Sequence, residues 1–243
     1  MIRKALDNYK NQQQASELPT LKAALFDMDG VIFDSMDYHA KSWVNAFKEV
    51  NIEFSEYEVY LNEGRTGAST IQNAFLAQKG RDASQTEIQA LYAIKSRYFE
   101  GCGEPIPMGF AQETLLQAQA LKLGIYLVTG SGQASLLNTL HTYFPSIFSK
   151  ENMVTAYDVT HGKPHPEPYL MGLEKAKVLP LEAIVVENAP LGVQAAVAAN
   201  LFTVAINTGI LEDKILEDAG AHLILDSLES FYRLLPDLAR AWK

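Results

Sequence analysis

Short apolar runs alternate with longer amphipathic stretches along most of this chain. Residues 21–26 are almost all apolar, as expected for a strand that is buried on both faces of a parallel sheet. The later runs predict strands at residues 125–128, 153–156, 183–186, 202–206 and 222–225, and the stretches between them predict helices at 111–122, 134–143, 166–176 and 190–200. Strands that alternate with helices predict a doubly wound, parallel α/β sheet.

Residues 36 to about 99 interrupt this alternation with helical periodicity alone. Trp43, Phe47 and Val50 recur at helical spacing, and no convincing strand follows before the proline- and glycine-rich loop at 101–109. We therefore expect an inserted all-α cap domain. The predicted division is a polar extension at 1–20, a core at 21–35 and 104–243, and a helical cap at 36–103.

The composition of the chain indicates which binding partners and which cellular compartment to expect. The net charge of −9 argues against nucleic acid as the main partner, and no stretch approaches the roughly 18 apolar residues of a membrane span. Cys102 is the single cysteine, and residues 1–20 lack an apolar secretory core, so we expect a cytoplasmic protein. Residues 1–20 are compatible with either a short helix or a disordered arm. We expect a monomer or a weak homo-oligomer.

Two carboxylates follow the first predicted strand. Asp27 and Asp29 lie two residues apart, so their side chains point roughly the same way in extended backbone, and Gly30 permits a sharp turn. In open α/β sheets, ligands bind at the carboxyl ends of strands. Two crowded carboxylates repel each other unless a hard cation such as Mg²⁺ lies between them. The alternative is a solvent-exposed turn without a ligand, because Asp and Gly are also common turn residues.

Polar residues also follow three later strands. Thr129, Gly130 and Ser131 form a small-residue loop before a helix, where hydroxyl and backbone N–H groups can hold a phosphate. Lys163 is fixed before a proline, and Glu187 and Asn188 add oxygen ligands. Each feature alone is ordinary loop chemistry. Together they supply the charge neutralisation and positioning that phosphoryl transfer requires, whereas GxxxxGK[ST] and GxGxxG motifs are absent from the sequence.

Four motifs carry a family resemblance in the expected order. FDMDGV begins at Phe26, VTGS at Val128, GKP at Gly162 and ENAPLGVQAA at Glu187. The chain resembles the haloacid dehalogenase superfamily, most closely the β-phosphoglucomutase-like phosphatases and mutases with a helical cap.

The resemblance implies a role for each core residue. Asp27 would be the nucleophile that becomes an aspartyl phosphate, and Asp29 the general acid and base. Thr129 and the Gly130 amide would hold the phosphoryl group, which Lys163 would neutralise. The implied Mg²⁺ ligands are Asp27, the backbone carbonyl of Asp29, Glu187 and Asn188. The family usually has Asp in place of Asn188, so we expect weaker Mg²⁺ binding here.

In the cap, the resemblance implies residues that contact substrate. His39 lies in DSMDYHAKSW, where mutase relatives have a similar Thr, His and Trp pattern, and could couple cap closure to Asp29; a capping or surface histidine is the alternative. Arg65, in EGRTG, suits a distal phosphate. Lys95 is a second candidate for that phosphate, with a solvated helix residue as the alternative.

Glu63 offers two interpretations. It could be the ion-pair partner of Arg65, or it could reach the metal or a metal-bound water when the cap closes, which would favour a small, metal-chelated phosphate such as pyrophosphate.

We therefore expect Mg²⁺-dependent hydrolysis of a small phosphorylated metabolite, either a sugar phosphate or pyrophosphate. A β-phosphoglucomutase would use the same core residues, and the sequence does not separate the two. A catalytically silent, metabolite-binding regulator is the alternative of another class, but it would not need a nucleophile.

Overall fold

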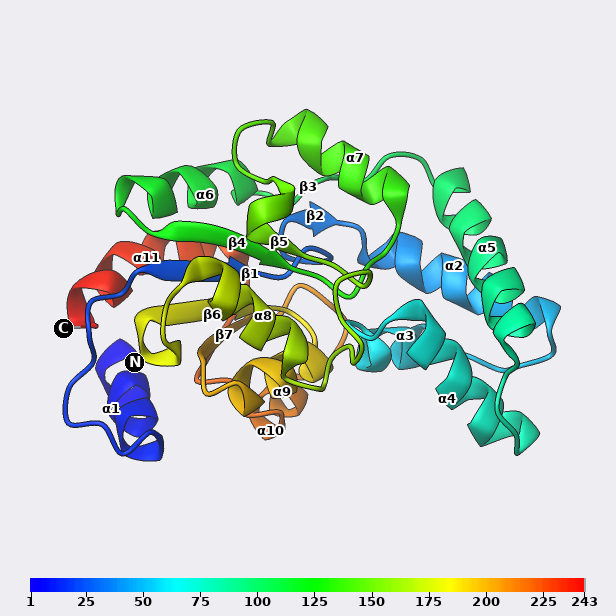
Figure 1. The fold of residues 1–243 in the computed structure, drawn as a ribbon, viewed down its shortest axis with the longest axis horizontal. Coiled ribbons are helices and arrows are strands. Elements are labelled where there is room, and N and C mark those ends of the chain that lie inside the picture. The colour runs from blue at the N-terminus through cyan, green and yellow to red at the C-terminus, as the bar shows by residue number, and fades with distance from the viewer. Residues whose placement is uncertain (243) are drawn as a thin grey trace.

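A six-stranded parallel sheet lies at the centre of the molecule, and the computed structural model describes residues 1–242 of the chain (Figure 1). The strand order is β5–β4–β1–β6–β7–β8, and every neighbouring pair is parallel. This confirms the predicted doubly wound core. The strands are β1 (Ala23–Phe26), β4 (Gly124–Val128), β5 (Met153–Val154), β6 (Ala183–Glu187), β7 (Phe202–Ile206) and β8 (Leu223–Leu225).

The alternation of side chains along β1 divides the core between the two faces of the sheet. Ala24 and Phe26 belong to the cluster that helices α6, α7 and α11 complete, whereas Ala23 and Leu25 pack with α8 and α9. All four strand residues are buried, which explains the apolar run. These helices and α10 are α6 (Ala111–Ala120), α7 (Ala134–Tyr143), α8 (Glu167–Ala176), α9 (Pro190–Ala198), α10 (Asp213–Asp218) and α11 (Leu228–Ala241).

Four helices between β2 and β3 share a hydrophobic cluster that is distinct from those of the sheet, although Leu211 of the core also joins it. It is centred on Trp43, Phe47, Ile71, Phe75 and Leu91. We call these helices the cap; they lie at one end of the sheet (Figure 1). Their separate cluster supports the proposed division of the chain into core and cap. They are α2 (Met36–Glu49), α3 (Glu56–Asn62), α4 (Gly67–Lys79) and α5 (Gln85–Gly101).

Two short segments link the core to the cap, and they pair with each other as strands. Strand β2 (Phe33–Asp34) is antiparallel to β3 (Ile106–Pro107). The loop predicted at 101–109 thus contains a short strand, because pairing with β2 satisfies backbone groups there.

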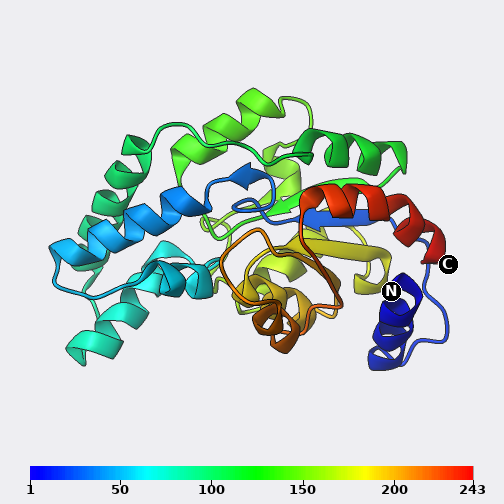
Figure 2. The ribbon, with the colours of Figure 1, turned by 180° about the vertical axis from the view of Figure 1, so that it is seen from behind.

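The amino-terminal segment packs against the core. Helix α1 (Ile2–Gln12) buries Tyr9, whose hydroxyl donates to the carbonyl of Asn200 at 2.8 Å and whose ring meets Phe202 edge-on at 5.4 Å. Seen from behind, both termini lie at the end of the sheet away from the cap (Figure 2). Among the described residues, we find no helix with the length and apolar character that a membrane crossing requires.

Candidate active site

A tight turn after β1 holds both aspartates inside the molecule. Asp27 and Asp29 are buried, and the N–H of Gly30 donates to the carbonyl of Phe33 at 2.8 Å. Gly30 has φ +79°, a conformation that favours glycine, and a Cβ atom there would overlap the side-chain amide of Asn188. Gly30 therefore lets the turn bring Asn188 close to the two aspartates.

Lys163 joins two carboxylates that come from different strands. Its Nζ donates to Oδ1 of Asp27 at 2.5 Å, to Oε1 of Glu187 at 2.6 Å and to the carbonyl of Val128 at 2.9 Å. The lysine side chain is fully buried. Burial lowers the pKa of Lys163, but the attraction of the two carboxylates outweighs it and raises the pKa above its usual value. Lys163 is therefore a permanent buried cation beside Asp27.

Burial raises the pKa of Asp27 well above its usual value, and the nearby charge of Lys163 opposes that rise. A cation near the free face of this carboxylate would favour its ionised, nucleophilic form.

Asp29 has a different environment, which reaches into the cap. Its Oδ1 accepts a hydrogen bond from Oγ of Ser35 at 2.6 Å and lies 2.9 Å from Nε2 of His39. Burial by itself raises the pKa of Asp29, but the charge and hydrogen bond of His39, the hydrogen bond from Ser35 and the charge of Lys95 together lower it. The pKa values of two aspartates on one turn are thus shifted in opposite directions.

His39 is oriented from its other side by Lys95. Nζ of Lys95 lies 3.0 Å from Nδ1 of His39 and donates to Oε1 of Gln133 at 2.8 Å. Lys95 thus fixes the orientation of the imidazole, whose Nε2 faces Asp29. Burial lowers the pKa of Lys95 to about 8. The structure thus contradicts both alternatives considered above, a surface histidine at His39 and a solvated lysine at Lys95.

The segment between α3 and α4, residues 63–66, lies over the phosphate-loop candidate. We call this segment the cap loop. A Cβ atom on Gly130 would overlap the carbonyl oxygen of Gly64, and a Cβ on Gly64 would lie 3.0 Å from Cδ of Lys163. In the loop beneath, the hydroxyl of Thr129 accepts the N–H of Ser131 at 2.9 Å. The cap loop therefore contacts both the predicted phosphate site and the catalytic lysine candidate.

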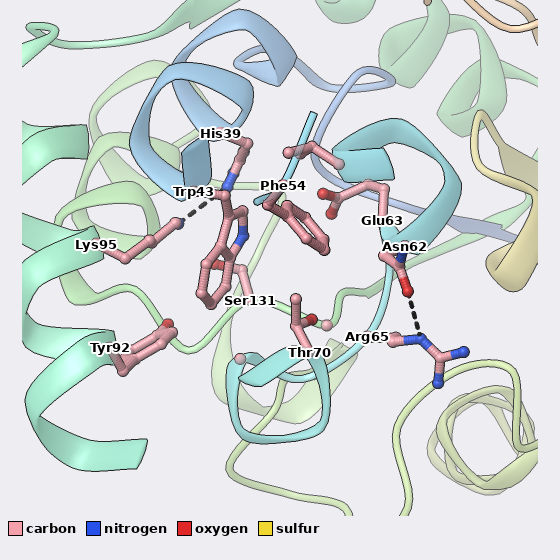
Figure 3. A pocket seen from close by; sticks show the side chains of 13 residues that line it. His39, Trp43, Phe54, Asn62, Glu63, Arg65, Thr70, Tyr92, Lys95 and Ser131 are labelled. Atoms are coloured by element: carbon pink, nitrogen blue, oxygen red, sulfur yellow. Dashed lines mark hydrogen bonds between the residues drawn. The ribbon is translucent and has the colours of Figure 1, made fainter. Parts of the chain in front are cut away.

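Glu63 and Arg65 point different ways from this loop (Figure 3). The Glu63 carboxylate turns towards the side where Phe54 lies, while Nε of Arg65 donates to Oδ1 of Asn62 at 3.1 Å and its guanidinium points away. Burial raises the pKa of Glu63. No ion pair between Glu63 and Arg65 occurs in the described structure. The ion-pair interpretation of Glu63 is therefore wrong for this arrangement.

The cavity that these side chains line is small. It lies between cap and core, has a volume of about 30 Å³ and is bounded by His39, Glu63, Lys95 and Ser131 among others (Figure 3). A single water needs about 10–15 Å³ on this measure, so the cavity has room for about two waters.

The oxygen atoms around Asp27 fit a Mg²⁺ ion. Oδ1 of Asn188 is buried and has no hydrogen-bond partner within residues 1–242, and an acceptor left bare in this way suits a metal ligand. Glu187 differs, because its Oε1 accepts from Lys163 and Tyr169 and its Oε2 accepts the N–H groups of Asn188 and Ala189. Both Glu187 oxygens are thus occupied by protein donors.

The structure brings the core residues and His39, Lys95 and Glu63 to one end of the sheet. Arg65 lines the same cavity, but its guanidinium points away from Glu63 (Figure 3). Sequence reasoning missed Gln133, which orients Lys95, and Tyr169, whose hydroxyl donates to Oε1 of Glu187 at 2.8 Å. Neither residue lies in a recognisable motif, so no sequence signal identified them.

Comparisons with known proteins agree with this chemistry. A family model described as haloacid dehalogenase-like hydrolase matches residues 21–200. Hexitol phosphatase A of Escherichia coli is 29% identical over 209 residues, which cover 86% of this chain and 92% of that protein. Validoxylamine A 7'-phosphate phosphatase of Streptomyces hygroscopicus subsp. limoneus is 27% identical over 189 residues, covering 77% of this chain and 86% of that protein.

A solved structure from Bacteroides vulgatus, provisionally named a beta-phosphoglucomutase, superposes with a TM-score of 0.95 at 46% identity, covering 100% of this chain and 98% of that one. The chain therefore belongs to the haloacid dehalogenase-like hydrolase family and is an enzyme of the phosphohydrolase or phosphomutase type.

Proposed function

We propose that this enzyme hydrolyses a small phosphate compound in two steps, through a phosphorylated Asp27. The observation that carries the proposal is the pairing of buried Asp27 with Lys163, next to an Asp29 that hydrogen bonds from the cap hold in place. A binding protein would not need this pair of differently tuned carboxylates.

In the first step, a carboxylate oxygen of Asp27 attacks phosphorus while the bond to the leaving oxygen breaks. Asp29 gives that oxygen a proton, which it must first take up from solvent with the substrate, because its pKa is lowered in this structure. In the second step, Asp29 takes a proton from water, the water oxygen attacks phosphorus, and the bond to Asp27 breaks to release inorganic phosphate. Lys163 neutralises charge on Asp27 throughout, and Thr129 and the Gly130 amide hold the phosphoryl oxygens.

We assign the metal ligands to Asp27, the backbone carbonyl of Asp29 and the amide oxygen of Asn188. Bound Mg²⁺ would supply further charge neutralisation at the phosphoryl group. Glu187 would orient Lys163, because its two oxygens already accept protein donors.

Restoring a charge at position 188 tests this assignment. We expect Asn188→Asp to reach half-maximal activity at a several-fold lower Mg²⁺ concentration, because a carboxylate attracts the cation more strongly than an amide oxygen does. The measurement is a Mg²⁺ titration of turnover in wild type and variant at saturating substrate. Equal midpoints would show that Asn188 does not contact the metal.

We propose pyrophosphate as the preferred substrate. Two observations support it over a sugar phosphate: the cap loop contacts Gly130 directly, and Glu63 faces the space under the cap. A carboxylate would repel a bare phosphate but suits one that is neutralised by a divalent cation.

Removal of Glu63 separates the two substrate classes. We expect Glu63→Ala to lower kcat/KM for pyrophosphate by about 10- to 100-fold, the usual effect of losing a charged contact. Hexitol phosphates and β-glucose 1-phosphate should be hydrolysed no more slowly, because the variant enlarges the cavity. The matched control is Glu58→Ala, which changes an acidic residue of α3 that caps its helix at Ser55. A wild-type rate on every substrate in Glu63→Ala would contradict the proposal.

The second candidate is a β-phosphoglucomutase, which the 46% identical structure favours. It would use Asp27 and Asp29 in the same roles, with a sugar hydroxyl as the acceptor in place of water. Arg65 would then have to turn from Asn62 to hold a second phosphate. The cap would have to open for either substrate, because the cavity of about 30 Å³ holds neither a sugar ring nor pyrophosphate.

A further inference from the structure

A group of metal-binding side chains lies outside the site described above, on the loop that carries Lys163. His161 and His165 flank that lysine, and Glu167 is the first residue of α8. One ligand atom from each of these three side chains lies within 4.8 Å of the others. Nothing in the phosphoryl-transfer chemistry uses them.

The three side chains are nearly in place to coordinate one ion. Nδ1 of His161 lies 2.9 Å from Oε2 of Glu167, Nδ1 of His165 lies 3.9 Å from the same oxygen, and the imidazole centroids are 4.8 Å apart. Ligand atoms around a tetrahedral Zn²⁺ ion are about 3.4 Å apart, given metal–ligand distances near 2.1 Å. Small rotations of these exposed side chains form the site, provided that Nδ1 of His165 gives up the N–H of Glu167, which it accepts at 3.2 Å.

Backbone donors hold the Glu167 carboxylate in this position. Its Oε1 accepts the N–H of Thr160 at 2.7 Å, and its Oε2 accepts the N–H of His161 at 3.0 Å. These hydrogen bonds lower the pKa of Glu167, so the carboxylate is ionised at neutral pH. The imidazoles of His161 and His165 are 63% and 52% exposed, which leaves room for water to complete the coordination.

We propose that His161, His165 and Glu167 form a second metal site, selective for a transition-metal ion of the Zn²⁺ type. Two imidazoles and one carboxylate suit Zn²⁺, Co²⁺, Ni²⁺ or Cu²⁺, whereas the oxygen ligands around Asp27 suit Mg²⁺. A bound ion would connect the two sides of the loop that holds Lys163.

The test is a Co²⁺ titration of tag-free protein at saturating Mg²⁺, followed by visible absorption and then by displacement with Zn²⁺. We expect one Co²⁺ ion per chain with an imidazole-containing spectrum. His161→Ala and His165→Ala should each weaken Zn²⁺ binding by about tenfold or more. The matched control is His141→Ala, which removes a histidine from the last turn of α7 and should bind as wild type does.

Thermal unfolding in EDTA will show that the variants fold. Glu167→Gln should also weaken Zn²⁺ binding, and its amide oxygen can still accept a backbone N–H of this loop. Wild-type Zn²⁺ affinity in both histidine variants, or an equal loss in His141→Ala, would overturn the proposal. The result does not depend on phosphohydrolase activity, since the readout is metal binding alone.

Discussion

Asp27→Asn should abolish turnover while leaving the fold intact. We expect the rate of phosphate release to fall by at least about 10⁴-fold, the scale seen when a catalytic nucleophile is removed. An amide does not attack phosphorus, whereas its oxygen can still accept the hydrogen bond that Lys163 now gives Asp27 at 2.5 Å. Because burial already disfavours a charge at Asp27, a neutral residue of the same shape should not lower stability.

Two measurements make this prediction specific. Protein quenched with acid during turnover should gain the mass of one phosphoryl group in wild type and none in Asp27→Asn. Thermal unfolding should show similar Tm values for the two proteins. A variant that keeps more than a tenth of the wild-type rate would contradict the assignment of Asp27 as nucleophile. A wild-type protein that binds phosphate compounds without turnover would support the regulator instead.

Lys163→Met should destabilise the protein as well as inactivate it. The change leaves Asp27 and Glu187 buried with no counter-charge, and breaking a buried ion pair in this way costs about 3–5 kcal/mol. For a chain of this size the corresponding fall in Tm is roughly 10 °C. Mg²⁺ should restore part of the loss, since a divalent cation would neutralise Asp27 from the other side.

The control is Lys214→Met, which removes a lysine of α10 that is 66% exposed and pairs with Asp218 at the surface. Surface pairs contribute about 1 kcal/mol or less, so this variant should unfold close to wild type. If Lys163→Met unfolded at the wild-type temperature, the buried cluster would not have the energetic role that its geometry indicates.

The sequence predicted the core of the site because each motif is local. Asp27, Thr129 and Glu187 lie at or just after the ends of β1, β4 and β6, and these strands are neighbours in the sheet. A parallel sheet places such strand ends at one edge, so motif order and topology together predicted their meeting. Lys163 follows the edge strand β5, and its long side chain reaches Asp27 from there.

The contacts that the cap contributes to the site were harder to predict from the sequence. Lys95 resembles a surface residue of an amphipathic helix, yet it is 2% exposed and bonds His39 and Gln133. Its burial depends on how the cap packs against the core, which no local pattern encodes. Helix α1 is a similar case, because its polar sequence conceals the few side chains, including Tyr9, that pack against the sheet.

The most direct test of the account is ³¹P NMR of the pure protein with Mg²⁺ in a mixture of pyrophosphate, β-glucose 1-phosphate and a trace of glucose 1,6-bisphosphate. We predict growth of the inorganic phosphate signal with pyrophosphate consumed fastest, since water is the acceptor and Glu63 faces the space under the cap. A new glucose 6-phosphate signal without release of inorganic phosphate would contradict hydrolysis and identify the enzyme as a mutase.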